Sequence, residues 1–185
     1  MIIFDLDGTL IRWWPEEVDC PQCDGIGCFD DAPCLVCDDN GKKTFHDRDR
    51  YGWVEPLPDR QYVLDRLIAQ GHKIGIATNQ TDIGFGRITM AKLTAKVEAV
   101  EAEFGHTFEW SIAMGSPGAP WPWNDSALVA QRKPAPTVID ALREEFPITV
   151  FVGDSMKDCE AAARGWVPFA SSDWFFDTGW KHFVS

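Results

Sequence analysis

The chain has 185 residues and is strongly acidic, with 17 Lys and Arg against 29 Asp and Glu and a formal net charge of -12. Because such a molecule as a whole repels nucleic acid and anionic membranes, a polyanionic substrate would need a local cluster of positive side chains. Its length and its 45% hydrophobic residues suit one core with at most a small appended module. No segment approaches the ~20 apolar residues of a membrane span and no basic leader opens the chain, so we expect a soluble, cytoplasmic protein with no membrane partner.

The first strand and the segment after it differ sharply in composition. Residues 2–4 are a short apolar run that predicts a buried strand ending at Asp5. Residues 12–55 are rich in Cys, Asp and Gly and show no apolar periodicity, which predicts an insert. We therefore expect a core of residues 1–11 and 56–185 and an insert of residues 12–55.

Helical and extended patterns alternate through the rest of the chain. Apolar residues at helical spacing predict helices over 62–68, 88–104, 138–146 and 156–164, and apolar runs predict strands over 73–78, 108–114, 149–152 and 167–170. Strands that alternate with helices imply right-handed crossovers and a parallel sheet. We predict an α/β fold with a doubly wound, Rossmann-like parallel sheet, whose ligands bind beyond the carboxyl ends of the strands.

A pair of carboxylates follows the first strand, in the run Asp-Leu-Asp-Gly-Thr at residues 5–9. In an extended segment Asp5 and Asp7 point to the same face, and Gly8 lets the backbone turn away sharply. A carboxylate can attack phosphorus when a metal ion neutralises the charge, and a second carboxyl can protonate the leaving oxygen. Taken alone, the run fits a turn or a helix cap equally well.

Further polar residues stand at or near other predicted strand ends. Thr78 ends one strand, Lys133 precedes Pro134, and Asp154 ends another strand, with Asp158 four residues later on the same helical face. Each has a simpler alternative when taken singly: a structural threonine, a solvated loop lysine, or a carboxylate placed at Asp158 by the helix dipole.

Together these four motifs, in this order, resemble those of the haloacid dehalogenase-like (HAD) hydrolase superfamily and span nearly all of the chain outside the insert. The resemblance implies that Asp5 is a nucleophile forming an aspartyl-phosphate and that Asp7 is the general acid and then the base. It also implies that Thr78 hydrogen-bonds a phosphoryl oxygen and that Lys133 neutralises the phosphoryl group. The implied Mg²⁺ ligands are Asp5, the Asp7 backbone carbonyl and Asp154. Asp158 would either ligate the ion through water or hold Lys133.

Residues 78–86 and the Arg-Lys-Pro at 132–134 resemble one branch, which holds polynucleotide 3'-phosphatases, histidinol phosphatases and heptose-bisphosphate phosphatases. On that resemblance Thr9, Asn79 and Arg132 are expected to bind substrate. The sequence departs from the branch at Asp82 and Phe85, where Gly and Arg are usual.

Three functions follow from these motifs. A polynucleotide 3'-phosphatase is favoured, and a sugar-phosphate or nucleotide phosphatase is the alternative. The charge of -12 counts against binding to an extended duplex. The third candidate is a non-catalytic, zinc-dependent interaction module on a HAD scaffold.

Five of the six cysteines lie between residues 20 and 37. Two Cys-x-x-Cys pairs, Cys20 with Cys23 and Cys34 with Cys37, can supply four thiolates to a tetrahedral Zn²⁺. The first pair also resembles the local knuckle of the DnaJ zinc domain. We expect a structural zinc that orders the insert, either as a cap over the active site or as a remote stability clip.

Six of the nine tryptophans fall into two groups. Trp110 and Trp166 are expected in the core. Trp13, Trp14, Trp121 and Trp123 are expected to border the active site, where they would pack the insert against the core or stack on a base.

Overall fold

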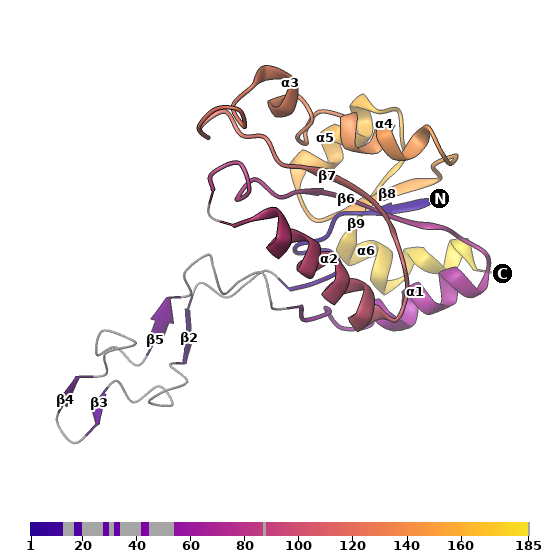
Figure 1. Ribbon diagram of the computed structural model, residues 1–185. Coiled ribbons are helices and arrows are strands. Elements are labelled where there is room, and N and C mark those ends of the chain that lie inside the picture. Colours follow the sequence, from indigo (N-terminus) through magenta and orange to yellow (C-terminus); the bar gives the residue numbers. More distant parts are fainter. Residues whose placement is uncertain are drawn as a thin grey trace.

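The computed structural model describes residues 1–12, 17–19, 28–29, 32–33, 42–44, 54–86 and 88–184. Within them, a parallel sheet has the strand order β7-β6-β1-β8-β9. Its strands are β1 Ile2–Phe4, β6 Ile74–Asn79, β7 Glu109–Ala113, β8 Val150–Gly153 and β9 Phe169–Ser171. The predicted doubly wound α/β fold is confirmed (Figure 1).

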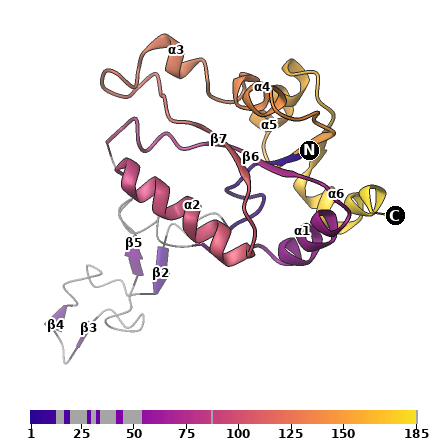
Figure 2. The same cartoon turned by 45° about the vertical axis from the view of Figure 1, so that its right-hand side comes forward.

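Helices cover both faces of this sheet (Figures 1 and 2). One face packs against α1 Arg60–Ala69, α2 Met90–Phe104, α6 Ser172–Asp177 and the 3-10 helix η2 Gly179–Phe183. The other packs against α4 Thr137–Arg143 and α5 Met156–Arg164, while the short α3 Ser126–Val129 precedes α4 in the chain. Strand β1 contributes side chains to the hydrophobic core on both faces of the sheet. Ile2 and Phe4 pack into the core on the first face, and Ile3 packs into the core on the other.

The elements lie where the apolar patterns predict them, with ends displaced by a few residues. The C-terminal α6 and η2 were not predicted. Phe175 and Phe176 of α6 pack on Phe4, and their ring centroids lie 5.5 and 5.7 Å from that of Phe4. The expectation for Trp166 was wrong: it is 93% exposed, at the turn after α5. Trp110 is partly buried against the core, and its indole N–H donates to Glu101 Oε1 at 2.9 Å.

Between residues 13 and 53 the structure describes only short paired strands. Strand β2 Glu17–Asp19 pairs antiparallel with β5 Lys42–Thr44, and β3 Cys28–Phe29 pairs with β4 Ala32–Pro33. The four expected zinc ligands, Cys20, Cys23, Cys34 and Cys37, lie outside the described residues. No helix in the described part of the chain combines the length and apolar character needed to cross a bilayer.

The register of the sheet brings the polar motifs to one edge. Phe4 pairs with Ile76 on one side and with Val152 on the other, so the residues that follow these strands leave the sheet side by side. Gly8 has φ 85°, a left-handed conformation that a glycine adopts without strain. As expected, it turns the chain after Asp7.

Candidate active site

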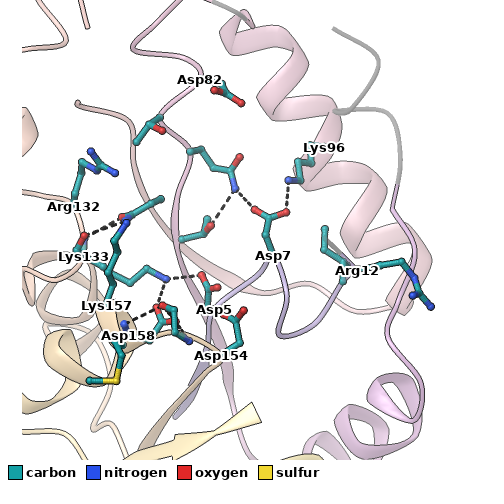
Figure 3. Close-up of a pocket in the computed structure, with 17 residues that line it drawn as sticks. Asp5, Asp7, Arg12, Asp82, Lys96, Arg132, Lys133, Asp154, Lys157 and Asp158 are labelled. Carbon is teal, nitrogen blue, oxygen red and sulfur yellow. Dashed lines mark hydrogen bonds and ion pairs between the residues drawn. The ribbon is translucent and has the colours of Figure 1, made fainter. Parts of the chain in front are cut away.

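A cleft of about 490 Å³ opens at the carboxyl ends of β1, β6 and β8 (Figure 3). Its lining carries charges of both signs. The carboxylates are Asp5, Asp7, Asp82, Asp154 and Asp158, and the cations are Arg12, Lys96, Arg132, Lys133 and Lys157. The five cations balance the five carboxylates, so in a chain of net charge -12 the cleft is less repulsive to an anionic substrate than the molecule as a whole.

Asp5 and Lys133 form a buried ion pair at the base of the cleft. The Lys133 ammonium donates to Asp5 Oδ1 at 2.5 Å and also lies 2.6 Å from Asp158 Oδ1. Burial raises the pKa of Asp5 to about 7, and Asp158 adds to this rise while Lys133 opposes it. Burial alone would lower the pKa of Lys133, but the two carboxylates outweigh it and the net shift is upward, so the lysine stays charged.

The carboxylate of Asp158 has two partners of different kinds. Its Oδ2 accepts hydrogen bonds from Ser155 N at 3.1 Å and Ser155 Oγ at 2.5 Å, and Ser155 Oγ accepts from Asp158 N, which together cap α5. Its Oδ1 faces Lys133. A Cβ on Gly153 would lie 2.5 Å from Asp158 Cβ, so glycine is needed for this approach.

Asp5, Asp154 and Asp158 form an acidic cluster that fits a hard divalent cation. One carboxylate oxygen of each lies within 4.8 Å of the others. Oxygen donors of this kind suit Mg²⁺. The raised pKa of Asp5 reflects burial and negative charge that a cation here would offset.

The residues at and after the end of β6 form hydrogen bonds with one another and with the loop that carries Lys133; they are Thr78, Asn79 and Gln80. Thr78 is buried, and its Oγ1 accepts a hydrogen bond from Gln80 Nε2 at 3.0 Å. The Asn79 side chain accepts from Lys133 N at 3.0 Å and donates to Lys133 O at 3.2 Å. Asn79, expected to bind substrate, therefore lines the cleft while it holds the Lys133 backbone.

Asp7 is held at both carboxylate oxygens. Oδ1 accepts from Lys96 Nζ at 2.9 Å, and Oδ2 accepts from Gln80 Nε2 at 2.7 Å (Figure 3). Sequence reasoning missed both partners. The available signal was that Lys96 takes an apolar place in the buried stripe of α2, between Leu93 and Val100.

The other two expected substrate-binding residues lie in different surroundings. Arg132 lines the cleft, and its buried Nε has no hydrogen-bond partner among the described residues. Thr9 is fully buried, and the described lining of the cleft does not include it. Its backbone carbonyl accepts from Arg60 Nε at 3.0 Å.

The tryptophans expected at the site do not contribute to the described lining. Trp121 is 80% exposed, and Trp123 packs against a small cluster around Ile83. Trp13 and Trp14 lie outside the described residues.

The sheet order and the cleft with its acidic cluster agree with the class that the sequence comparisons show, a phosphatase of the HAD superfamily. The chain belongs to the polynucleotide kinase 3 phosphatase family, whose profile matches residues 25–178. The match includes the ends of β6 and β8 and the loop of Lys133, whereas Asp5 and Asp7 precede it.

One named relative is similar to this chain in sequence, and two solved structures share its fold. A D-glycero-beta-D-manno-heptose-1,7-bisphosphate 7-phosphatase of Pseudomonas putida is 32% identical over 140 residues, which are 69% of this chain and 75% of that protein. A HAD-like phosphatase from Mesorhizobium loti shares the fold with a TM-score of 0.65 at 15% identity, over 100% of this chain and 87% of that one. A D,D-heptose 1,7-bisphosphate phosphatase from B. bronchiseptica, crystallised with magnesium and phosphate, gives a TM-score of 0.56 at 23% identity over 92% and 77%.

Proposed function

We propose that this chain is a Mg²⁺-dependent phosphomonoesterase that works through an aspartyl-phosphate on Asp5. The observation that carries the proposal is the placement of the Asp5 carboxylate, beside the Lys133 ammonium and within 4.8 Å of the carboxylates of Asp154 and Asp158. A nucleophile, a fixed cation and a divalent-cation site thus share the base of one cleft.

Each side chain has a role in this mechanism. Asp5 and Asp154, with the Asp7 carbonyl, would hold Mg²⁺ directly, and Asp158 would reach it through water. The ion would neutralise charge between the attacking carboxylate and the phosphate. Lys133 and Thr78 stabilise the phosphoryl oxygens by ammonium and hydroxyl contacts.

The reaction then has two halves. A carboxylate oxygen of Asp5 bonds to phosphorus in line as the ester P–O bond breaks, and Asp7 gives its proton to the leaving oxygen. Asp7 next takes a proton from water, whose oxygen attacks phosphorus. Inorganic phosphate leaves and the Asp5 carboxylate is restored.

The substrate class proposed first is the 3'-phosphorylated end of a nucleic acid, supported by the family match. A sugar phosphate is the second candidate, supported by the name of the 32% identical relative and by the net charge of -12. In either case Arg132 and Asn79 would contact the substrate from the wall of the cleft.

A panel of 3'-phosphorylated oligonucleotides, mononucleotides and sugar phosphates, assayed by phosphate release with Mg²⁺, tests this function. We expect turnover that requires Mg²⁺ and vanishes in Asp5→Asn. The matched control is Asp177→Asn, an exposed aspartate at the end of α6, which should keep wild-type activity. Full activity of Asp5→Asn on any of these esters contradicts the mechanism.

For residues 12–55 we propose a zinc-ordered insert on the core of residues 1–11 and 56–185. The support is the sequence spacing of Cys20, Cys23, Cys34 and Cys37, which suits a four-thiolate Zn²⁺ site. Metal analysis of protein purified without chelator should find about one zinc per chain, and less than about half an equivalent contradicts the assignment.

A further inference from the structure

Lys96 is a buried cation that packing does not explain. It lies on the core-facing side of α2, in line with Leu93, Val100 and Phe104, and is 7% exposed. Burying an ammonium costs several kcal/mol unless it is well paired, whereas an apolar side chain at this place would add to the core. A lysine at a core-facing position where an apolar side chain would fit points to a role in the adjoining cleft.

The ammonium of Lys96 holds one oxygen of Asp7, and a second buried residue holds the other. Lys96 Nζ lies 2.9 Å from Asp7 Oδ1, and Gln80 Nε2 donates to Asp7 Oδ2 at 2.7 Å (Figure 3). Gln80 is 3% exposed, and its amide also donates to Thr78 Oγ1, so it is fixed at the end of β6. Two separate elements therefore fix the rotation of a single carboxylate.

We propose that Lys96 and Gln80 are positioning residues for Asp7, which orient its carboxylate for proton transfer to the leaving oxygen and from water. Each carboxylate oxygen has two acceptor sites, so one contact on each leaves room for the transferred proton. Proton transfer depends steeply on geometry, and a displacement of about 1 Å can cost ~10²-fold in rate. This inference rests on the proposed function, because it assigns Asp7 the role of acid and base.

Two phosphate esters whose leaving groups differ in basicity distinguish the positioning role of Lys96 and Gln80 from a purely structural role. Phenoxide is a much stronger base than 4-nitrophenoxide, so phenyl phosphate needs the proton of Asp7 far more than 4-nitrophenyl phosphate does. A variant that only loosens the fold slows both esters to a similar extent. A variant that misdirects Asp7 slows phenyl phosphate more.

The experiment measures kcat and KM on both esters for Lys96→Met and Gln80→Met, with Asp7→Asn as the reference. We expect kcat/KM on phenyl phosphate, which reports the half-reaction that expels the leaving group, to fall about 10- to 100-fold, and kcat/KM on 4-nitrophenyl phosphate to fall much less. Lys92→Met, at an exposed position one turn away on α2, is the matched control and should leave the ratio of the two rates unchanged. Thermal melting checks that each variant is folded.

Adding Lys96→Met to Asp7→Asn makes the test sharper. With no acid left to orient, the second change should not alter the ratio further. Equal losses on both esters, or a ratio that still shifts in the Asp7→Asn background, overturn the inference. Should Lys96→Met fail to fold, Gln80→Met on the loop after β6 decides the same question.

The same data separate failure of the inference from failure of the proposed function. If Asp7→Asn does not change the ratio, Asp7 is not the acid and the proposed function is wrong at that step. If Asp7→Asn changes the ratio while Lys96→Met and Gln80→Met do not, only the positioning role is overturned.

Discussion

Three side chains at the base of the cleft share an unbalanced charge. Lys133 contacts Asp5 and Asp158, so one buried ammonium faces two buried carboxylates. Two negative charges around one positive charge leave an excess that low-polarity surroundings penalise. The arrangement favours binding of a cation, and it raises the free energy of the protein when no cation is bound.

This excess gives stability a pH dependence in buffer without Mg²⁺. The pKa of Asp5 is raised from its ordinary value of 3.8 to about 7 in the folded protein, so between these values the folded state binds a proton that the unfolded state has lost. Stability from this group is therefore present below pH ~4 and is lost as the pH rises to about 7. Asp5→Asn, which carries no charge, should unfold at a higher temperature than the wild type at pH 8.

Thermal melts of both proteins at pH 5 and pH 8, without Mg²⁺ or chelator, check this expectation. At pH 5 only part of this stability has been lost, so the advantage of Asp5→Asn should be clearly smaller than at pH 8. An equal advantage of Asp5→Asn at both pH values contradicts the account.

The sequence predicted those site residues whose chemistry follows from the residue type and from a position near a strand end. Asp5, Asp7, Lys133 and Asp154 follow or lie near strand ends, and the structure gathers them in one cleft. Sequence reasoning did not find that Asn79 holds the Lys133 backbone or that Lys96 and Gln80 hold Asp7. These contacts join residues 54 to 89 positions apart, and only the assembled tertiary structure defines them.

At the scale of elements, α5 approaches β8 through a position that only glycine can fill. The N-terminal cap of α5 places Asp158 against Gly153, where an added Cβ would lie 2.5 Å from Asp158 Cβ and 2.7 Å from its Cγ. The closeness of this helix to the strand sets where Asp158 meets Lys133.

Gly153→Ala should displace Asp158 and Lys133 together. We expect a loss of about 1–3 kcal/mol of stability, typical of overpacking, and a fall in kcat at saturating Mg²⁺. The matched change is Gly118→Ala, whose Cβ would meet the Phe85 ring at an ordinary 3.5 Å. Denaturant unfolding and steady-state rates check both variants, and wild-type behaviour of Gly153→Ala contradicts this role for the close approach.

Helices and strands with strong local patterns were predicted correctly, and an element whose formation depends on tertiary contacts was missed. The apolar stripe predicted α2, which Thr89 caps and which ends at Gly105 in a left-handed conformation. The C-terminal α6 has only six residues and depends on packing of Phe175 and Phe176 against the sheet, too short a segment for periodicity to reveal. Trp166 was misplaced because an aromatic type alone does not predict burial.

At the scale of the molecule, the cleft gathers five cations beside five carboxylates and so differs from the acidic chain as a whole. A chain of net charge -12 has Arg132, Lys133, Lys157, Lys96 and Arg12 around one opening. With a bound divalent cation added to these side chains, the cleft would attract a phosphate ester, while the acidic molecule as a whole repels long polyanions. The combination favours a substrate that presents one accessible phosphate, either at the end of a nucleic acid or on a small molecule.

The central claim is that the phosphoryl group is transferred to Asp5, and chemical trapping tests it most directly. Borohydride added during turnover reduces an acyl phosphate to an alcohol, so the peptide containing residues 1–12 should carry homoserine in place of Asp5. Mass spectrometry should find this product only when substrate and Mg²⁺ are both present. Turnover without reduction at residue 5, or reduction at another aspartate, would contradict the account.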